Sequence, residues 1–105
     1  MAMRYYRRDG TIYRDVLEWA RDFENLKIKR VAATTLLDGR LVSTVWLGLN
    51  HQVALNGPPL IFETMVFADE SRLVEEYCFR YSSESAALEG HHSVVQALEE
   101  GRTPA

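Results

Sequence analysis

The N-terminal part of the chain predicts a short ribbon followed by a helix. Asp9-Gly10 lies between two short β-type runs, and this residue pair favours a tight hairpin turn. After Asp15, a residue type that caps helices, apolar side chains recur at Val16, Trp19 and Phe23. This is the interval of one helical face, so the pattern predicts a helix that packs its aromatic residues inward.

The C-terminal part predicts a second helix. Ser82-Ser83 indicates its start, and Gly101 should end it. Its apolar stripe consists of Ala87, Leu88, His91, Val94, Val95 and Leu98. We expect residues 102–105 to form a frayed tail.

Between these helices the pattern changes to β-rich runs joined by turns. Asp38-Gly39 separates two long runs and predicts a hairpin with a two-residue turn, in which Leu37 faces Arg40. Residues 60–67 and 75–81 form a third and a fourth predicted strand. The expected fold is one α+β domain over residues 1–105: a four-stranded antiparallel meander with a short N-terminal hairpin, and with one helix before and one after the sheet.

The predicted hairpin register gives the two central strands distinct faces. Val31 would lie opposite Trp46, and Ala32 opposite Val45. The face expected to pack against the helices holds Ile28, Ala32, Leu36, Leu41, Val45, Leu47 and Leu49. Trp46 would lie on the uncovered face beside Val42, and we therefore expect a homodimer joined through this face. A bulge that reverses the parity would instead place Trp46 in the core beneath a helix.

Composition and charge narrow the class of protein. The 105 residues are 47% hydrophobic and 26% charged, which is typical of a globular protein. No apolar run reaches the ~20 residues of a membrane span, and the N-terminus lacks a secretory h-region. We therefore expect no membrane partner and a cytoplasmic location in a bacterial host. Residues 1–30 include eight basic and five acidic residues, whereas residues 31–105 include four basic and ten acidic residues. A phosphate-bearing ligand would suit the basic part, whereas the pI of about 5.6 argues against binding to duplex nucleic acid.

Two titratable residues interrupt apolar patterns. His91 lies on the apolar stripe of the second helix, beside Gly90, which implies close backbone approach. It is either a core histidine with satisfied hydrogen bonds or a side chain aimed into a pocket. Glu63 shares a strand face with apolar residues and needs a cationic partner, for which Arg30 and Arg80 are the candidates. The pair is either structural or part of a ligand site.

Asn50-His51 closes the second long strand, where side chains stand at the end of the sheet. His51, Glu63 and His91 could form a two-histidine, one-carboxylate metal site, but their spacing matches no ligand motif. Cys78 is the only cysteine, and the chain has no Gly-rich phosphate loop and no GxSxG motif. We expect no metal, no cofactor and no catalytic residue. The predicted ligand-binding residues are Trp46, Asn50, His51, Glu63, Arg80 and His91.

Four segments together carry a resemblance: LEWARDFE, DGRLVSTVWLGLNH, GPPLIFETMVF and RYSSESAALEGHHSVV. They resemble a group of small uncharacterised proteins encoded by bacteriophage and bacterial genomes, with GPPLIFETMVF as the most specific block. Where such proteins often have Asp-His, this chain has Asn50-His51. The resemblance implies a phage or mobile-element context and brings no activity with it.

This context suggests a non-enzymatic binding protein that counters host defence, either by binding a host protein or by sequestering a nucleotide signal. One alternative is a small hydrolase or nuclease that uses His51, Glu63 and His91. Another is a structural or accessory protein of the phage.

Overall fold

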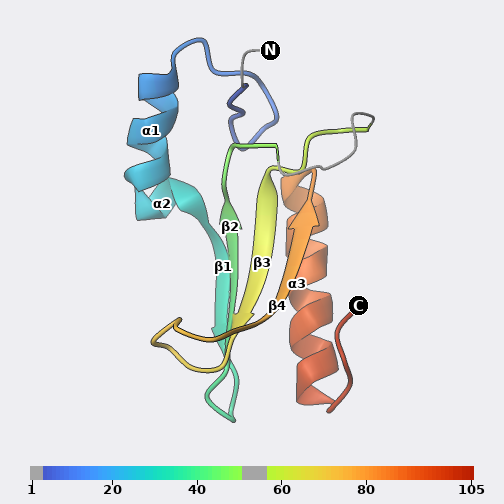
Figure 1. Cartoon of the computed structure of the whole chain (residues 1–105). Coiled ribbons are helices and arrows are strands. Elements are labelled where there is room, and N and C mark those ends of the chain that lie inside the picture. Colours follow the sequence, from blue (N-terminus) through green and yellow to red (C-terminus); the bar gives the residue numbers. More distant parts are fainter. Residues whose placement is uncertain (1–3, 51–56) are drawn as a thin grey trace.

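The computed structural model describes residues 4–50 and 57–105 and has the predicted α+β architecture (Figure 1). Helix α1 (Val16–Glu24) and the short helix α2 (Leu26–Lys29) precede the sheet, and helix α3 (Glu84–Glu99) follows it. The four antiparallel strands lie in sequence order: β1 (Arg30–Thr35), β2 (Leu41–Trp46), β3 (Phe62–Phe67) and β4 (Glu75–Tyr81). Within the described parts of the chain, no helix is long and apolar enough to cross a membrane.

Side chains cap the helices at the predicted positions. Asp15 accepts a hydrogen bond from the backbone N–H of Leu17 at the start of α1. Asn25 ends α1 and caps α2, so the single helix expected here is divided in two. Ser83 caps α3 in the same way. The caps satisfy backbone donors that have no partner inside a helix.

The end of α3 is more tightly packed than the frayed tail that we expected. Gly101 has a φ of 73°, and its N–H donates to the carbonyl of Leu98. The N–H of Arg102 donates to the carbonyl of Ala97 at 2.7 Å, which completes a Schellman motif. Pro104 is buried. Residues 102–105 therefore return toward the helix instead of extending from it.

The turn between β1 and β2 has the predicted location but not the predicted length. The N–H of Leu36 donates to the carbonyl of Arg40 at 2.8 Å, so the loop has three residues and Leu36, not Leu37, faces Arg40. Gly39 takes a φ of 95°, and the carboxylate of Asp38 accepts from the N–H of Arg40 at 3.0 Å. Both features suit a three-residue loop as well as they suit the two-residue turn.

Because the loop has one residue more than expected, the β1–β2 register differs by one position from the prediction, and the faces predicted for β2 are wrong. Ala32 pairs with Thr44 instead of Val45, and a further irregularity lies between Arg30 and Ala32. A one-residue shift moves every side chain of a strand to the other face. Ala32 still faces α3, but the β2 residues beside it are now Val42, Thr44 and Trp46.

Trp46 is consequently a core residue, and the prediction that it forms a dimer interface is wrong. Its side chain is fully buried, and its Nε1–H donates to the carbonyl of Tyr6 at 2.9 Å. Phe23 of α1 packs against it with ring centroids 6.3 Å apart, and Trp19 stacks on Phe23 at 5.0 Å. The N-terminal ribbon thus closes the core at this end and supplies the acceptor that a buried indole requires.

No helix from the described residues lies across the opposite face of the sheet. We call this the open face; on β2 and β3 it carries Leu41, Ser43, Val45, Glu63, Met65 and Phe67. The β3–β4 loop, residues 68–74, curves across the lower end of the sheet toward β1 (Figure 1). There the Thr35 hydroxyl donates to the carboxylate of Glu70 at 3.2 Å. The open face is therefore bordered by α2 on one side and by this loop on the other.

Candidate ligand-binding site

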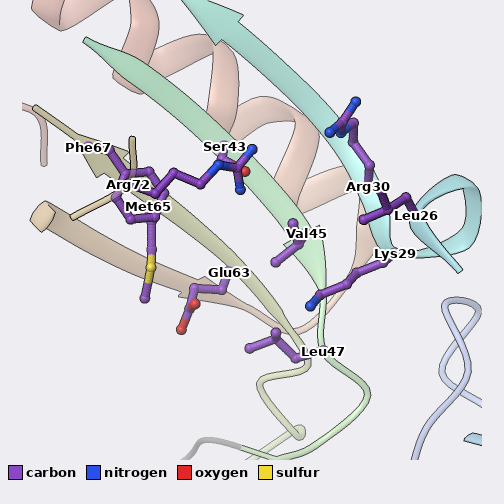
Figure 2. Close-up of a pocket in the computed structure, with 10 residues that line it drawn as sticks. All are labelled: Leu26, Lys29, Arg30, Ser43, Val45, Leu47, Glu63, Met65, Phe67 and Arg72. Atoms are coloured by element: carbon purple, nitrogen blue, oxygen red, sulfur yellow. The ribbon is translucent and has the colours of Figure 1, made fainter. Parts of the chain in front are cut away.

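A hollow of about 220 Å³ lies on the open face, between α2 and the β3–β4 loop (Figure 2). It is lined by Leu26, Lys29, Arg30, Ser43, Val45, Leu47, Glu63, Met65, Phe67 and Arg72. Its floor is formed by alternate side chains of β2 and β3, because residues two apart in a strand share a face. The floor is mainly apolar apart from Ser43 and the carboxylate of Glu63, and the cations stand at its borders.

Three cations border the hollow: Lys29, Arg30 and Arg72. Among the described residues none of them forms an ion pair. Figure 2 shows Lys29 and Arg72 extending into the hollow from opposite borders, with Arg30 along the rim. Lys29 Nζ lies 3.9 Å from the ring centroid of Phe23, and the Arg72 guanidinium lies 5.7 Å from that of Phe67. The aromatic contacts hold these cations in place without neutralising their charge.

Arg72 has an unusual backbone conformation. Its φ is 63°, in the left-handed region that costs a non-glycine residue ~1 kcal/mol or more. The turn is fixed by Asp69, whose carboxylate accepts from the N–H of Ser71 at 2.8 Å and whose carbonyl accepts from the N–H of Arg72. Hydrogen bonds to the Asp69 carboxylate from the Ser71 hydroxyl, and then from the Ser71 N–H, lower the pKa of this carboxyl. A bulky cation therefore occupies a position that glycine would fill with less strain.

Glu63 and Arg80 form the ion pair expected from the sequence. The two residues are direct neighbours across β3 and β4, and Arg80 Nε lies 3.2 Å from Glu63 Oε2. The Glu63 side chain is 8% exposed, whereas that of Arg80 is 41% exposed. The cross-strand register thus selects Arg80 over Arg30 as the partner. Burial, followed by the nearby Glu63 charge, raises the pKa of the Cys78 thiol to about 11.

His91 lies on the other side of the sheet, in a buried polar network beneath α3. Its Nε2 is 2.9 Å from the Thr34 hydroxyl, and its Nδ1 is 2.7 Å from the Thr44 hydroxyl. Thr44 also bonds to the hydroxyl of Thr64 on β3. Burial, followed by the proximity of His92, lowers the pKa of His91, which favours the neutral ring. One imidazole therefore connects α3 to two strands.

Gly90 explains why α3 can approach the sheet this closely. A Cβ atom at this position would overlap the ring of Tyr81 on β4. The sequence indicated such an approach, because glycine costs ~1 kcal/mol relative to alanine inside a helix. Of the two interpretations of His91, these contacts support the core histidine with satisfied hydrogen bonds.

The structure separates the residues predicted to bind ligand. Glu63 and Arg80 lie on the open face, Glu63 within the hollow, whereas Trp46 and His91 are buried on the face covered by α3. Asn50 lies at the end of the sheet, where its side chain accepts from the N–H of Leu60 at 3.0 Å. His51 falls outside the described residues. Across residues 4–50 and 57–105, no three His, Cys, Asp or Glu side chains form a group suited to a metal ion.

Sequence reasoning missed the two cations that point into the hollow. The excess of basic residues before Val31 was a signal for Lys29, although it did not single out this residue from its neighbours. Arg72 belongs to a polar turn and gave no signal, because its position depends on how the loop crosses the sheet. Comparison with known proteins adds no homologue: no protein-family model, curated protein or solved structure matches the chain.

Proposed function

We propose that this protein is a non-enzymatic binding protein that holds a small anionic molecule in the open-face hollow. The observation that carries the proposal is the pairing of an apolar floor with Lys29, Arg30 and Arg72, cations that have no ion-pair partner among the described residues. Clustered cations without a counter-charge favour an anionic ligand, since its binding supplies the missing partner.

A nucleotide has the chemistry that such a site would recognise. Its phosphate would lie between Lys29 and Arg72, and its planar base would rest on the apolar side chains of Leu47 and Met65. The buried carboxylate of Glu63 would accept a hydrogen bond from an amino or hydroxyl group of the ligand. Each part of the hollow would then have a counterpart on the ligand.

The biological role that we propose is sequestration of a nucleotide signal used in host defence. Its support is the resemblance to phage-encoded proteins together with the cationic hollow. The alternative of a hydrolase gains no support from the described residues, because Glu63 and His91 face opposite sides of the sheet. A partner protein on the host side would need a broader surface than this hollow and is one outcome of the test below.

The test is an NMR titration of the ¹⁵N-labelled protein with AMP, and with adenosine as the uncharged comparison. We expect AMP to shift the amide signals of Lys29, Val45, Met65 and Arg72. Adenosine should bind about tenfold more weakly, since a charge-assisted hydrogen bond contributes ~1.5–3 kcal/mol. Equal binding of the two compounds, or no shift with AMP at millimolar concentration, would refute a nucleotide site. If the amide signals shifted only on addition of a host protein, the ligand of this protein would be that partner and not a nucleotide.

Variants locate the site. Lys29→Ala should weaken AMP binding about tenfold by removing one charged contact. Lys27→Ala is the matched control, because Lys27 is an exposed lysine on the same helix that does not line the hollow. Arg72→Gly should weaken binding by a similar factor while leaving the free energy of unfolding unchanged or higher by ~1 kcal/mol, because glycine accepts the positive φ. Equal loss in Lys27→Ala and Lys29→Ala would show nonspecific attraction.

A further inference from the structure

Glu63 gives the open-face hollow a hydrogen-bond acceptor at its floor. Among the described residues that line the hollow, it is the only acidic one. Its side chain is 8% exposed and stands in a row across the sheet, with Val45 opposite it on β2 and Arg80 opposite it on β4. Met65, two residues along β3, lies on the same face (Figure 2). A ligand in the hollow would therefore meet this carboxylate beside apolar side chains.

The carboxylate keeps hydrogen-bonding capacity after its contacts within the protein. A carboxylate offers about four acceptor positions on its two oxygens. Arg80 Nε donates to Oε2 of Glu63 at 3.2 Å, and the Cys78 thiol also donates to this carboxylate. No other hydrogen bond to it comes from the described residues. About two acceptor positions therefore remain, and a ligand that displaces water from this nearly buried group must satisfy them.

Arg80 also decides the charge of the group that would contact Glu63. It already forms an ion pair with the carboxylate, so a ligand need not bring a second cation to this position. Neutral N–H donors suffice, and the neighbouring side chains of Val45 and Met65 favour donors carried by a flat, largely apolar ring. The ligand group that fits is a planar heterocycle whose edge presents two adjacent N–H donors.

Guanine is the one common nucleobase with such an edge. Its N1–H and its N2 amino group lie side by side, so both can donate to one carboxylate. Adenine and cytosine each have a single amino group with a ring-nitrogen acceptor beside it, and uracil has one N–H between two carbonyls. When a carboxylate lies opposite any of these three bases, it faces an acceptor lone pair, which disfavours binding.

We infer that the hollow selects guanine nucleotides, with the carboxylate of Glu63 accepting hydrogen bonds from N1–H and the N2 amino group. The inference rests on the proposed function, because it assumes that a nucleotide phosphate lies between Lys29 and Arg72. The phosphate contacts are the same for every nucleotide, so they contribute affinity without selecting a base. The contact with Glu63 selects the base, which makes Glu63 the specificity-determining residue of the site.

The test compares the affinities of GMP, IMP and AMP in NMR titrations of the ¹⁵N-labelled protein. Wild-type protein should bind GMP about tenfold more tightly than AMP, since one hydrogen bond to a charged group contributes about that factor. IMP keeps N1–H but lacks the N2 amino group, and it should bind with intermediate affinity. IMP binding as tight as that of GMP would overturn the two-donor contact.

Glu63→Gln and a matched control separate this contact from the rest of the site. A glutamine amide accepts through its oxygen and donates through its nitrogen, which matches the adjacent donor and acceptor of adenine. Glu63→Gln should therefore prefer AMP to GMP. Glu75→Gln should keep the preference for GMP, because Glu75 is an exposed acid of β4 that does not line the hollow. Circular dichroism verifies that both variants are folded, and the wild-type comparison does not depend on them.

The outcomes distinguish the inference from the function on which it rests. Equal affinity of wild-type protein for GMP and AMP would overturn the selection of guanine and leave the nucleotide site in place. A preference for GMP that persists in Glu63→Gln would overturn the role of Glu63. Binding of neither nucleotide at millimolar concentration would overturn the proposed function and the inference together.

Discussion

Replacement of His91 by alanine tests whether the buried network beneath α3 stabilises the fold. The change removes two hydrogen bonds, to Thr34 at 2.9 Å and to Thr44 at 2.7 Å. Each contributes ~1 kcal/mol net. The ring is only 2% exposed, so its removal also leaves a cavity. Thr44 keeps its bond to Thr64, which limits the loss on the sheet side. Together these effects predict that the free energy of unfolding falls by about 3 kcal/mol.

Urea denaturation followed by circular dichroism measures this loss, and His92→Ala is the matched control. His92 is the adjacent residue of α3 and is exposed, so its replacement should change stability by no more than ~0.5 kcal/mol. With the urea m-values of small proteins, the loss in His91→Ala moves the midpoint by roughly 1–3 M. Equal midpoints for the two variants would refute the reasoning, because they would show that the Thr–His–Thr network contributes nothing to folding. Loss of ligand binding in His91→Ala at unchanged stability would instead favour a pocket role for the ring.

Two further predictions concern the same helix. Because the pKa of His91 is lowered in the folded state, the unfolded chain binds a proton that the folded chain does not. Wild-type stability should therefore fall as the pH drops below ~6.5, by at most ~1.4 kcal/mol per pH unit. His91→Ala should flatten this slope in urea titrations between pH 6.5 and 5, and an unaltered slope would contradict the assignment. Gly90→Ala should lower the thermal midpoint even though alanine favours a helix by ~1 kcal/mol, because its Cβ meets the Tyr81 ring. A raised midpoint would show that α3 can move away from β4 at little cost.

The order and type of the elements were predictable from the sequence because the periodicities are local. The faces of the sheet were not, and the reason lies in one loop. Asp9-Gly10 and Asp38-Gly39 both form three-residue loops with a glycine at positive φ, although the same residue pair also favours two-residue turns. At Asp38-Gly39 that single residue displaces β2 by one position against β1, which places Trp46 in the core and Val45 on the open face.

The apolar content of β2 could not reveal the error in the predicted register, since both faces of this strand are comparably apolar. Thr44 looks like a surface residue in the sequence, and its hydrogen bonds to the imidazole of His91 and the hydroxyl of Thr64 make its burial favourable. The Glu63–Arg80 pair was predictable as one of two choices, because a carboxylate among apolar residues requires a cation. Arg72 was not predictable, since its place beside the hollow depends on the path of a loop and on a strained φ that no local pattern encodes.

The position of α3 after all four strands in the chain affects how the protein is made. The face of the sheet that carries Val42, Thr44 and Trp46 is covered by a helix that leaves the ribosome after all four strands. Until then, all four strands can have emerged while the hydroxyl of Thr44 still lacks its imidazole partner and Val42 and Val66 still lack the side chains of α3 that cover them. The nascent chain therefore cannot complete this part of its core before α3 has emerged, and until then it presents an apolar surface that a chaperone can bind.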